Sequence, residues 1–534
     1  MPADRSAAPE SADYVVVGAG PAGCVLANRL SASPGNRVVL LEAGGPDKAR
    51  EIRIPAAFSK LFATAYDWNY RTAPQPGLGG RELFWPRGRT LGGSTSINAQ
   101  MWIRGCAADY DGWGLPGWSF AEVLPYFNRV ERRAGPGSAY GADGPLWIEE
   151  LRSPSPITAA FLAACREAGI PDQPDLNGAD NTGCSPTPVT QHRGARRSAA
   201  DAYLRPAMRR PNLTVVTGAT VDRLRIADSR SGSGRRVTGV SYRAADGTVR
   251  ELTAQREVLL CAGAVNSPHI LQLSGVGDPD RLRAAGIEPV HELPGVGAGL
   301  QDHLSAGVVL GCPQPITLVA AESAGSLARY LLARTGMLSS NVAEAVAFVS
   351  SAGSGLPDVE VIFAPVPFIE HGMVPPPGHG LTIGVVLLQP GSRGTVSAAS
   401  ANPAEPPVIE PGYLSDPRDL EVLMWGMRQA ERLARTEALR PYAGEPMAPY
   451  DGPADDAGLA ESIRKHSETL YHPVGTCRMG ADDDEGAVVD PQLRVRGLAG
   501  LRVVDASVMP RINRGHTMAP VYMIAEKAAE LISR

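Results

Sequence analysis

A glycine-rich turn between two apolar segments constrains the fold of this chain more than any other feature. Residues 13–45 read DYVVVGAGPAGCVLANRLSASPGNRVVLLEAGG. The valine- and leucine-rich runs have the length and composition of buried strands, and the stretch between them has helical spacing. This pattern predicts a strand–helix–strand unit of the kind that builds a doubly wound parallel sheet.

The turn carries the three glycines of a dinucleotide-binding motif. Gly18 permits the tight turn, Gly20 lets the backbone approach a pyrophosphate, and Gly23 lets the helix pack closely on the strand. Glu42 ends the second strand, where an acidic side chain can accept hydrogen bonds from a ribose. An ordinary glycine-rich turn leaves Glu42 and Gly23 unexplained, so the sequence favours a bound dinucleotide.

The rest of the chain adds two further patterns. Residues 212–263 hold alternating apolar runs around the turn AADG, which predicts a β-hairpin. From about residue 305 to 465, longer strands such as LTIGVVLL precede a predicted helix over DLEVLMWGMRQAERLAR, and the chain closes with a strand in LRVVDASVMP and a helix that starts near Pro520. We therefore expect an α/β protein with a second, antiparallel sheet.

Composition excludes several classes of protein. At roughly 150 residues per domain, 534 residues correspond to about two to four domains. The formal net charge of −5 disfavours nucleic acid as a partner. Seven scattered cysteines without zinc-ligand spacing predict a reducing compartment and no metal site. The polar N-terminal residues 1–12 lack the layout of an export signal, and no apolar run reaches the roughly 20 residues of a membrane span, so we expect a soluble, cytoplasmic protein.

Several motifs together resemble the glucose-methanol-choline (GMC) family of FAD-dependent oxidoreductases, in particular its branch of choline dehydrogenase-like alcohol dehydrogenases and oxidases. The resemblance spans nearly the whole chain. It rests on the N-terminal motif with Glu42 and on GRTLGGSTSIN, GAVNSPHILQLSGVG, PGVGAGLQDHL, HPVGTCRMG, LRVVDASVMP and GHTMAPVYMIAEKAAE.

The resemblance implies a GMC fold: a discontinuous, Rossmann-like FAD-binding domain and a substrate domain whose antiparallel sheet is covered by helices. The FAD-binding domain would comprise residues 12–150, 211–304 and 466–534, and the substrate domain residues 151–210 and 305–465. The flavin ring would lie where the two domains meet.

The resemblance also implies which residues bind FAD. The residues that would hold the ADP half are Gly18, Gly20, Gly23, Glu42 and Val221. The residues that would contact the flavin ring, the ribityl chain or the pyrophosphate are Arg89, Gly93, Ser94, Asn98, Asp505 and Ala506. Some members of the family bind the flavin covalently through a histidine, and this chain has Ile97 there. We therefore expect noncovalent FAD.

Alcohol oxidation removes a hydroxyl proton and a hydride from the adjacent carbon, so a base and a hydride acceptor must face the same carbon. The resemblance assigns the base to His472, the orientation of the substrate oxygen to His516, and the hydride acceptor to flavin N5. We assign structural roles to the other seven histidines: His192, His269, His291, His303, His371, His379 and His466.

Substrate and electron acceptor stay open at this point. Glu344 is a candidate pocket carboxylate, and with aromatic residues such as Phe348, Phe363, Phe368 or Tyr471 it could serve choline. Neutral small-molecule alcohols are the favoured substrates, and oxygen or a quinone-like carrier would take the electrons. The alternatives are a hydroxynitrile-lyase-like enzyme on the same FAD scaffold, a nicotinamide dehydrogenase and a non-enzymatic FAD-binding scaffold. The oligomeric state is not readable.

Overall fold

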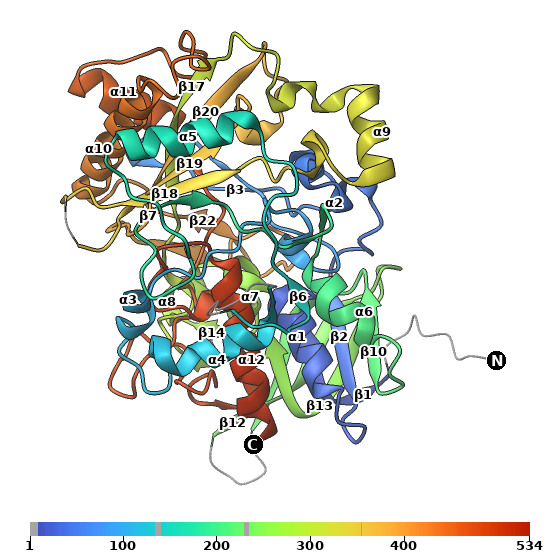
Figure 1. Cartoon of the computed structure of the whole chain (residues 1–534). Helices are drawn as coiled ribbons and strands as arrows, with labels where there is room; N and C mark the ends of the chain where they lie inside the picture. Colours follow the sequence, from blue (N-terminus) through green and yellow to red (C-terminus); the bar gives the residue numbers. More distant parts are fainter. Residues whose placement is uncertain (1–8, 134–139, 229–233, 354) are drawn as a thin grey trace.

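The structure is a computed structural model that describes residues 9–133, 140–228, 234–353 and 355–534. Most of the predicted N-terminal tail, residues 1–8, lies outside the described residues, and the first strand already begins at Ser11. Two large sheets occupy different parts of the molecule, one below the other in Figure 1. The protein is of the α/β class, as predicted from its sequence.

The first sheet has eight strands and contains the predicted strand–helix–strand unit. Its central strands pair in parallel in the order β10, β2, β1 and β13, while β13, β12 and β11 pair in antiparallel fashion. The strands are β1 (Ser11–Val17), β2 (Val38–Glu42), β10 (Leu213–Thr217), β11 (Thr220–Asp228), β12 (Arg235–Arg243), β13 (Val249–Leu260), β24 (Leu498–Ala499) and β25 (Leu501–Val503).

The second sheet has six strands, all antiparallel, in the order β23, β17, β20, β19, β18 and β7. These are β7 (Gly183–Pro186), β17 (Leu304–Gly311), β18 (Ala345–Val349), β19 (Val359–Ala364), β20 (Gly380–Leu387) and β23 (Glu468–Thr469). Helices α5 and α10 pack on this sheet.

Shorter strands form a three-stranded sheet and four pairs: β16 (Ala298–Leu300), β21 (Gly394–Ser397) and β22 (Val408–Glu410); β3 (Tyr70–Arg71) with β4 (Phe84–Trp85); β5 (Glu131–Arg132) with β6 (Leu146–Trp147); β8 (Gln191–His192) with β9 (Ala195–Arg196); and β14 (Val276–Gly277) with β15 (His291–Glu292).

The α-helices are α1 (Pro21–Leu30), α2 (Arg50–Arg53), α3 (Ala107–Asp111), α4 (Phe120–Val130), α5 (Pro156–Glu167), α6 (Arg205–Ala207), α7 (Gly263–Leu273), α8 (Pro279–Ala284), α9 (Ala324–Ala333), α10 (Pro417–Ala434), α11 (Asp456–His466) and α12 (Met518–Ser533). Short 3₁₀ segments include η1 (Pro55–Leu61), η3 (Gly93–Ser96), η5 (Leu318–Glu322) and η6 (Met337–Ser339).

Helix α12 joins the end of the chain to its beginning. It packs beside α1 and α4 (Figure 1) and is buried over most of its length. Its buried Glu526 accepts hydrogen bonds from Arg29 of α1, at 2.6 Å, and from the Tyr203 hydroxyl, at 2.7 Å. These bonds compensate for the cost of burying the carboxylate, so the C-terminal helix is fixed against the glycine turn.

Several local predictions are confirmed. The AADG turn joins β12 to β13, with hydrogen bonds between Ala244 and Thr248, and the predicted helix over residues 419–435 is α10. All seven cysteines are free and buried. Among the described residues, no helix is both long enough and apolar enough to cross a bilayer.

The close packing expected of Gly23 has a direct geometric basis. A Cβ atom added to Gly23 would lie 1.8 Å from the carbonyl oxygen of Gly18, far inside van der Waals contact. Because the obstacle is backbone of the same turn, no side-chain rotation can relieve the clash. Gly35, in the turn before β2, is exposed, and an added Cβ there would meet no atom within 4 Å.

We predict that Gly23→Ala lowers the free energy of unfolding by at least about 2 kcal/mol, because overpacking against a fixed backbone forces the helix away from the strand. Gly35→Ala serves as the matched control and should change stability by less than about 1 kcal/mol. Urea unfolding followed by circular dichroism measures both. Equal unfolding midpoints for the two variants would contradict the role assigned to Gly23.

Candidate active site

A single large cavity, of about 1590 Å³, receives residues from both sheets. Two of the residues expected from the sequence, Gly23 and Glu344, do not line it. The others do: Gly18, Gly20, Glu42, Arg89, Gly93, Ser94, Asn98, Val221, His472, Asp505, Ala506 and His516. The fold therefore brings the glycine turn and both candidate catalytic histidines to one space, although more than 400 residues of chain separate them.

At the glycine turn, Glu42 is oriented by the backbone. Its carboxylate oxygens accept hydrogen bonds from the amides of Ala19, at 2.7 Å, and Gly44, at 2.8 Å. Burial raises the pKa of Glu42 to about 7, and the two amide bonds oppose that rise. Each carboxylate oxygen has a second lone pair, so Glu42 can still accept from a ribose hydroxyl.

Two buried nitrogen atoms on the cavity wall have no hydrogen-bond partner among the described residues. They are Nε of Arg89, whose guanidinium also lies over the Trp68 ring at 4.8 Å, and Nε2 of His269. Burial lowers the pKa of His269 to about 4, so its ring is neutral. Because unsatisfied buried polar atoms are costly, these two indicate a polar ligand in the cavity.

The segment from Gly92 to Asn98 forms another part of the wall, and residues far away in sequence hold it. Gly93 has φ of +53°, and a Cβ there would lie 2.7 Å from Cα of Gly20. The buried Arg196 donates to the carbonyl of Thr95 and, at 2.7 Å, to Oδ1 of Asn98. Burial lowers the pKa of Arg196 to about 9. Ile97, at the position where a histidine could bond the flavin, is buried and offers only hydrocarbon.

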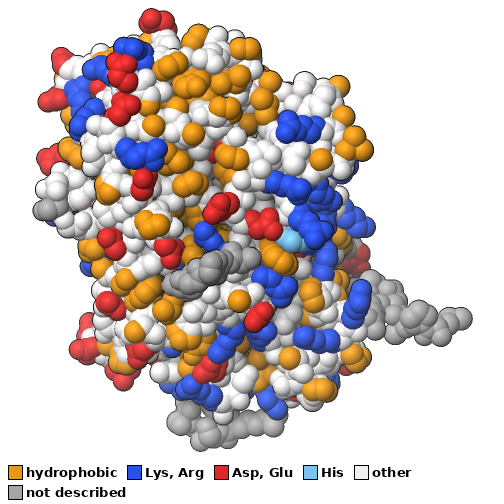
Figure 2. All heavy atoms as spheres, viewed as in Figure 1, with side chains coloured by type: hydrophobic (Ala, Val, Ile, Leu, Met, Phe, Trp, Pro, Cys, Tyr) orange, Lys and Arg blue, Asp and Glu red, His pale blue; other side chains and the backbone are white. Residues whose placement is uncertain are grey.

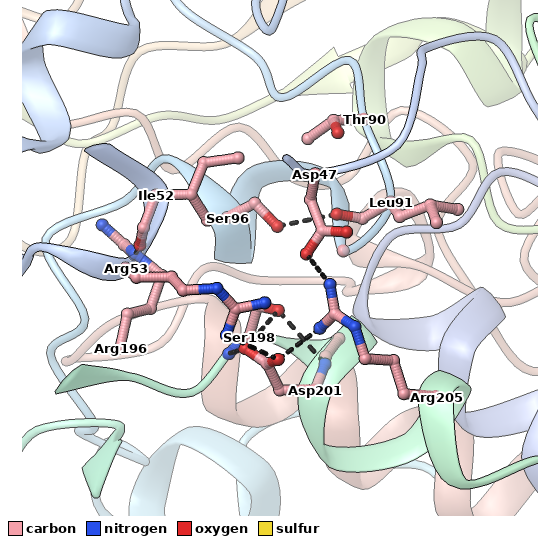
Figure 3. A network of polar contacts seen from close by, with 12 residues as sticks. Asp47, Ile52, Arg53, Thr90, Leu91, Ser96, Arg196, Ser198, Asp201 and Arg205 are labelled. Carbon is pink, nitrogen blue, oxygen red and sulfur yellow. Dashed lines mark hydrogen bonds and ion pairs between the residues drawn. The ribbon is translucent and has the colours of Figure 1, made fainter. Parts of the chain in front are cut away.

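Figure 3 shows the polar network behind this segment. Arg205 bridges Asp47 and Asp201, and Ser198 also contacts Asp201. Ser96 donates to the carbonyl of Leu91 at 2.7 Å. These contacts join α6 to the loop after β2, and the amide of Ala199 donates to the Thr95 hydroxyl at 3.0 Å, which links this network to the cavity wall.

Asp505 lines the cavity, but its carboxylate is fully occupied by the protein. One oxygen accepts from the amide of Gly263 and the hydroxyl of Ser267, and the other accepts from the amide and hydroxyl of Ser507. Its role is therefore to fix the start of α7.

His472 and His516 lie together at the end of the cavity near the second sheet. Their ring centroids are 4.7 Å apart and the rings are nearly perpendicular. His472 also contacts His303, with 3.0 Å between the two Nδ1 atoms. Burial, helped by the neighbouring His516, His303 and Arg87, lowers the pKa of His472 well below its usual value. His472 is therefore neutral at pH 7.

The hydrogen bonds assign the tautomer of His472. Nε2 of His303 donates to the carbonyl of Leu388, at 3.1 Å, and burial lowers the pKa of His303 to about 3, so this ring is neutral. Nδ1 of His303 is then an acceptor, and the hydrogen between the two rings belongs to Nδ1 of His472. Nε2 of His472, which no described residue engages, carries a free lone pair.

His303 is a site residue that the sequence analysis assigned to a structural role. The motif QDH at residues 301–303 was the sequence feature that could have indicated a site role for His303. Asp302 accepts from the amide of His472 at 2.7 Å and from the Thr469 hydroxyl at 2.6 Å, while Gln301 contacts the backbone of Pro510 and Ile512. Burial raises the pKa of Asp302 to about 6. All three residues of the motif therefore support the loops that carry the two histidines.

His516 has its own buried partner, which the sequence did not indicate. Nε2 of His516 lies 2.9 Å from Oε1 of Glu360 on β19, and Glu360 is fully buried. Because the carboxylate accepts, Nε2 of His516 donates, which leaves Nδ1 for the cavity side.

Backbone strain concentrates around the same cavity. Of the eleven non-glycine residues with positive φ in the described chain, seven line the cavity: Ala63, Asn69, Gln100, Val342, Glu370, His371 and Tyr471. Tyr471, with φ of +69°, directly precedes His472. Strained conformations persist only where surrounding contacts enforce them, and they cluster at functional sites.

The structure corrects the expectation for Glu344. This fully buried carboxylate lies outside the cavity and accepts hydrogen bonds from the Ser155 amide and from the hydroxyls of Thr158 and Ser340. Its side chain serves the start of α5, because a buried carboxylate needs several donors. Phe348 and Phe363 are also core residues away from the cavity, whereas Phe368 and Tyr471 line it.

The sequence profile of the family described as GMC oxidoreductase matches residues 12–305 and 390–525. An uncharacterized GMC-type oxidoreductase of Mycobacterium tuberculosis is 52% identical to the chain, covering 97% of this chain and 99% of the relative. Mitochondrial choline dehydrogenase of Mus musculus is 41% identical, covering 97% and 89%. The crystal structure of pyridoxine 4-oxidase from Mesorbium loti superposes with a TM-score of 0.87 at 32% identity, covering 97% and 98%.

The cavity fits the cofactor of this family. Its lining includes the glycine turn with Glu42, the two unpartnered buried nitrogens and the paired histidines. FAD is accordingly the cofactor of this protein. The chain belongs to the GMC oxidoreductase family and is an FAD-dependent enzyme of alcohol oxidation.

Proposed function

We propose that this enzyme oxidises a neutral alcohol, with His472 taking the hydroxyl proton and His516 orienting the alcohol oxygen. The free lone pair on Nε2 of His472 carries the proposal, because the contact with His303 leaves this nitrogen as the one acceptor of the ring. A positioned base of this kind typically contributes about 10² to 10⁴ in rate. Bound FAD supplies the hydride acceptor.

The start of α12 supports negative charge in the cavity. Thr517, Met518 and Val521 line the cavity wall at the first turn of this 16-residue helix. The first backbone amides of a helix lack intrahelical partners, and the helix dipole places partial positive charge there. This end of the cavity therefore favours a cofactor or substrate group that gains electron density.

The charges around the histidines disfavour a cationic substrate. Arg87 lines the cavity, donates to the carbonyls of Pro86 and Tyr471, and forms no ion pair among the described residues. The buried carboxylates of Asp302 and Asp67 act on Arg87 electrostatically, and the exposed Glu370 lines the cavity without an ion pair among the described residues. Neutral alcohols are favoured because Arg87 lies close to the proposed base and makes no direct ion pair there.

Aromatic side chains provide the apolar part of the substrate space. The rings of Phe58, Phe62 and Tyr471 line the cavity, and the Phe62 ring lies 5.8 Å from Phe58 and 5.9 Å from Tyr471. Phe84 and Phe368 extend the same cluster. Aromatic walls of this kind favour alcohols with an apolar body.

We predict that His472→Ala lowers the anaerobic rate of flavin reduction about 10²- to 10⁴-fold while FAD stays bound, because only the base is removed. His379→Ala, which alters a histidine outside the cavity, is the control and should retain the rate. The rate of flavin reduction in His303→Ala should lie between the rates of these two variants. His303→Asn restores an acceptor for the His472 ring, so its rate should exceed that of His303→Ala.

Stopped-flow absorbance measures these rates, and the visible flavin spectrum measures occupancy. A His472→Ala enzyme that is reduced at the rate of the unmodified protein would remove His472 from the reaction. Product formation by the unmodified enzyme without any bleaching of the flavin would instead identify a lyase.

We predict that kcat/KM stays at its plateau as the pH falls through 6.5. The active form of His472 is the neutral ring, and its lowered pKa keeps the ring neutral to a pH below the usual histidine value. The acid limb of the profile should therefore have its midpoint below 6.5. The profile is measured with a substrate that does not titrate, and a midpoint at or above 6.5 would contradict the assignment.

We predict that 3,3-dimethylbutan-1-ol is a better substrate than choline by roughly tenfold in kcat/KM, since the positive charge of choline would lie close to the Arg87 guanidinium. The two alcohols have nearly the same shape and differ in the positive charge. A preference for choline would refute the neutral-substrate proposal. Exposure of the reduced enzyme to air then reports whether oxygen accepts the electrons.

A further inference from the structure

Helix α9 presents an apolar face to solvent instead of to the protein. Leu327 is 43% exposed, Leu331 68% and Leu332 89%. Leu327 and Leu331 lie one turn apart on the same face, and Leu332 lies about 100° farther round the helix. Tyr330, about 160° from Leu332 around the helix, is the one buried residue of α9. The helix is therefore held by one face and exposes the more apolar one.

Arginines lie within α9 and on segments next to it. Arg329 lies within α9 and Arg334 directly follows it. The Tyr330 hydroxyl donates to the carbonyl of Arg53 at 3.0 Å, and the carbonyl of Arg334 packs against Gly194, next to Arg193. Figure 2 shows Lys and Arg side chains gathered immediately below the position of α9.

Most of this positive charge is uncompensated. Arg193, Arg329 and Arg334 form no ion pair among the described residues, and Arg53 has one contact of 3.5 Å with Asp201. The nearby carboxylate of Glu322 is paired with Lys60 at 2.6 Å. Exposed leucines with unpaired arginines beside them have the composition of a segment that lies in the interface of an anionic bilayer.

We propose that α9 and its flanking arginines dock this enzyme on an anionic lipid surface. The leucines would enter the boundary between headgroups and acyl chains, and the guanidinium groups would bind lipid phosphates, which they match in geometry. The attachment is peripheral, because the helix lies along the surface and does not span it.

A second copy of the chain fits this face less well. In a symmetric dimer centred on the leucines, each protomer would place Arg329 and Arg334 near the same residues of its partner. Like charges at such an interface oppose association. An anionic surface covers the leucines and neutralises the arginines at the same time, so charge complementarity favours lipid.

The cavity opens beside this surface. Lys60 of η1 pairs with Glu322 of η5, the segment that leads into α9, while the preceding Ser59 lies against Gly372. Met373 and Val374 follow; they line the cavity and are about 40% exposed. Docking through α9 would therefore hold an apolar part of the cavity wall near the lipid.

Flotation of the purified holoenzyme with vesicles tests the proposal. Vesicles of phosphatidylcholine mixed with phosphatidylglycerol should carry the enzyme, those of phosphatidylcholine alone should not, and binding should fall as salt rises from about 0.05 M to about 0.5 M. Leu331→Asp with Leu332→Asp, or Arg329→Glu with Arg334→Glu, should each weaken binding roughly tenfold or more. Val249→Asp, which alters an exposed apolar residue on β13, is the matched control and should bind normally.

All variants should keep their FAD and their activity in solution, because none of these residues lines the cavity. Absence of binding to anionic vesicles, or binding that the α9 variants leave unchanged, would overturn the proposal. So would light scattering that finds a dimer dissolved by the leucine substitutions, since α9 would then be covered by a second copy.

Discussion

The contact between two neutral imidazoles, those of His303 and His472, is the interaction on which the chemistry of this site depends. A carboxylate in the place of His303 would also accept the Nδ1 hydrogen of His472, but its charge would raise the pKa of His472 and favour the protonated ring. A neutral imidazole fixes the tautomer without that effect. In the proposed reaction, the buried site therefore holds His472 oriented and unprotonated before a substrate arrives.

Most charged side chains near the histidines act by orienting another residue. Asp302 holds the backbone of His472, Glu360 holds His516, and Arg196 holds Asn98. Each of these residues acts by orienting another one, and each has its own charge offset by hydrogen bonds or a partner. Arg87 forms no direct ion pair among the described residues, and the buried carboxylates of Asp302 and Asp67 offset its charge from a distance.

The sequence predicted those parts of the fold and site that depend on local pattern. The strand–helix–strand unit follows from apolar periodicity and glycine spacing, and the cavity-lining role of His472 follows from a motif. The site role of His303 could not be predicted, because the sequence shows its motif but not the direction in which its ring points. The prediction of Glu344 as a pocket carboxylate was wrong for a similar reason. Glu344 directly precedes a buried strand, and the packing of α5 determines where its side chain points.

The cofactor cavity is closed by segments from opposite ends of the chain. The glycine turn is made first, but His472, His516 and the helix α12 that packs on α1 all belong to the last 63 residues. During synthesis on the ribosome, these residues emerge more than 400 residues after the glycine turn, and so do β24 and β25 of the first sheet. A nascent chain can therefore form its first strand–helix–strand unit long before the cavity and the first sheet can be completed.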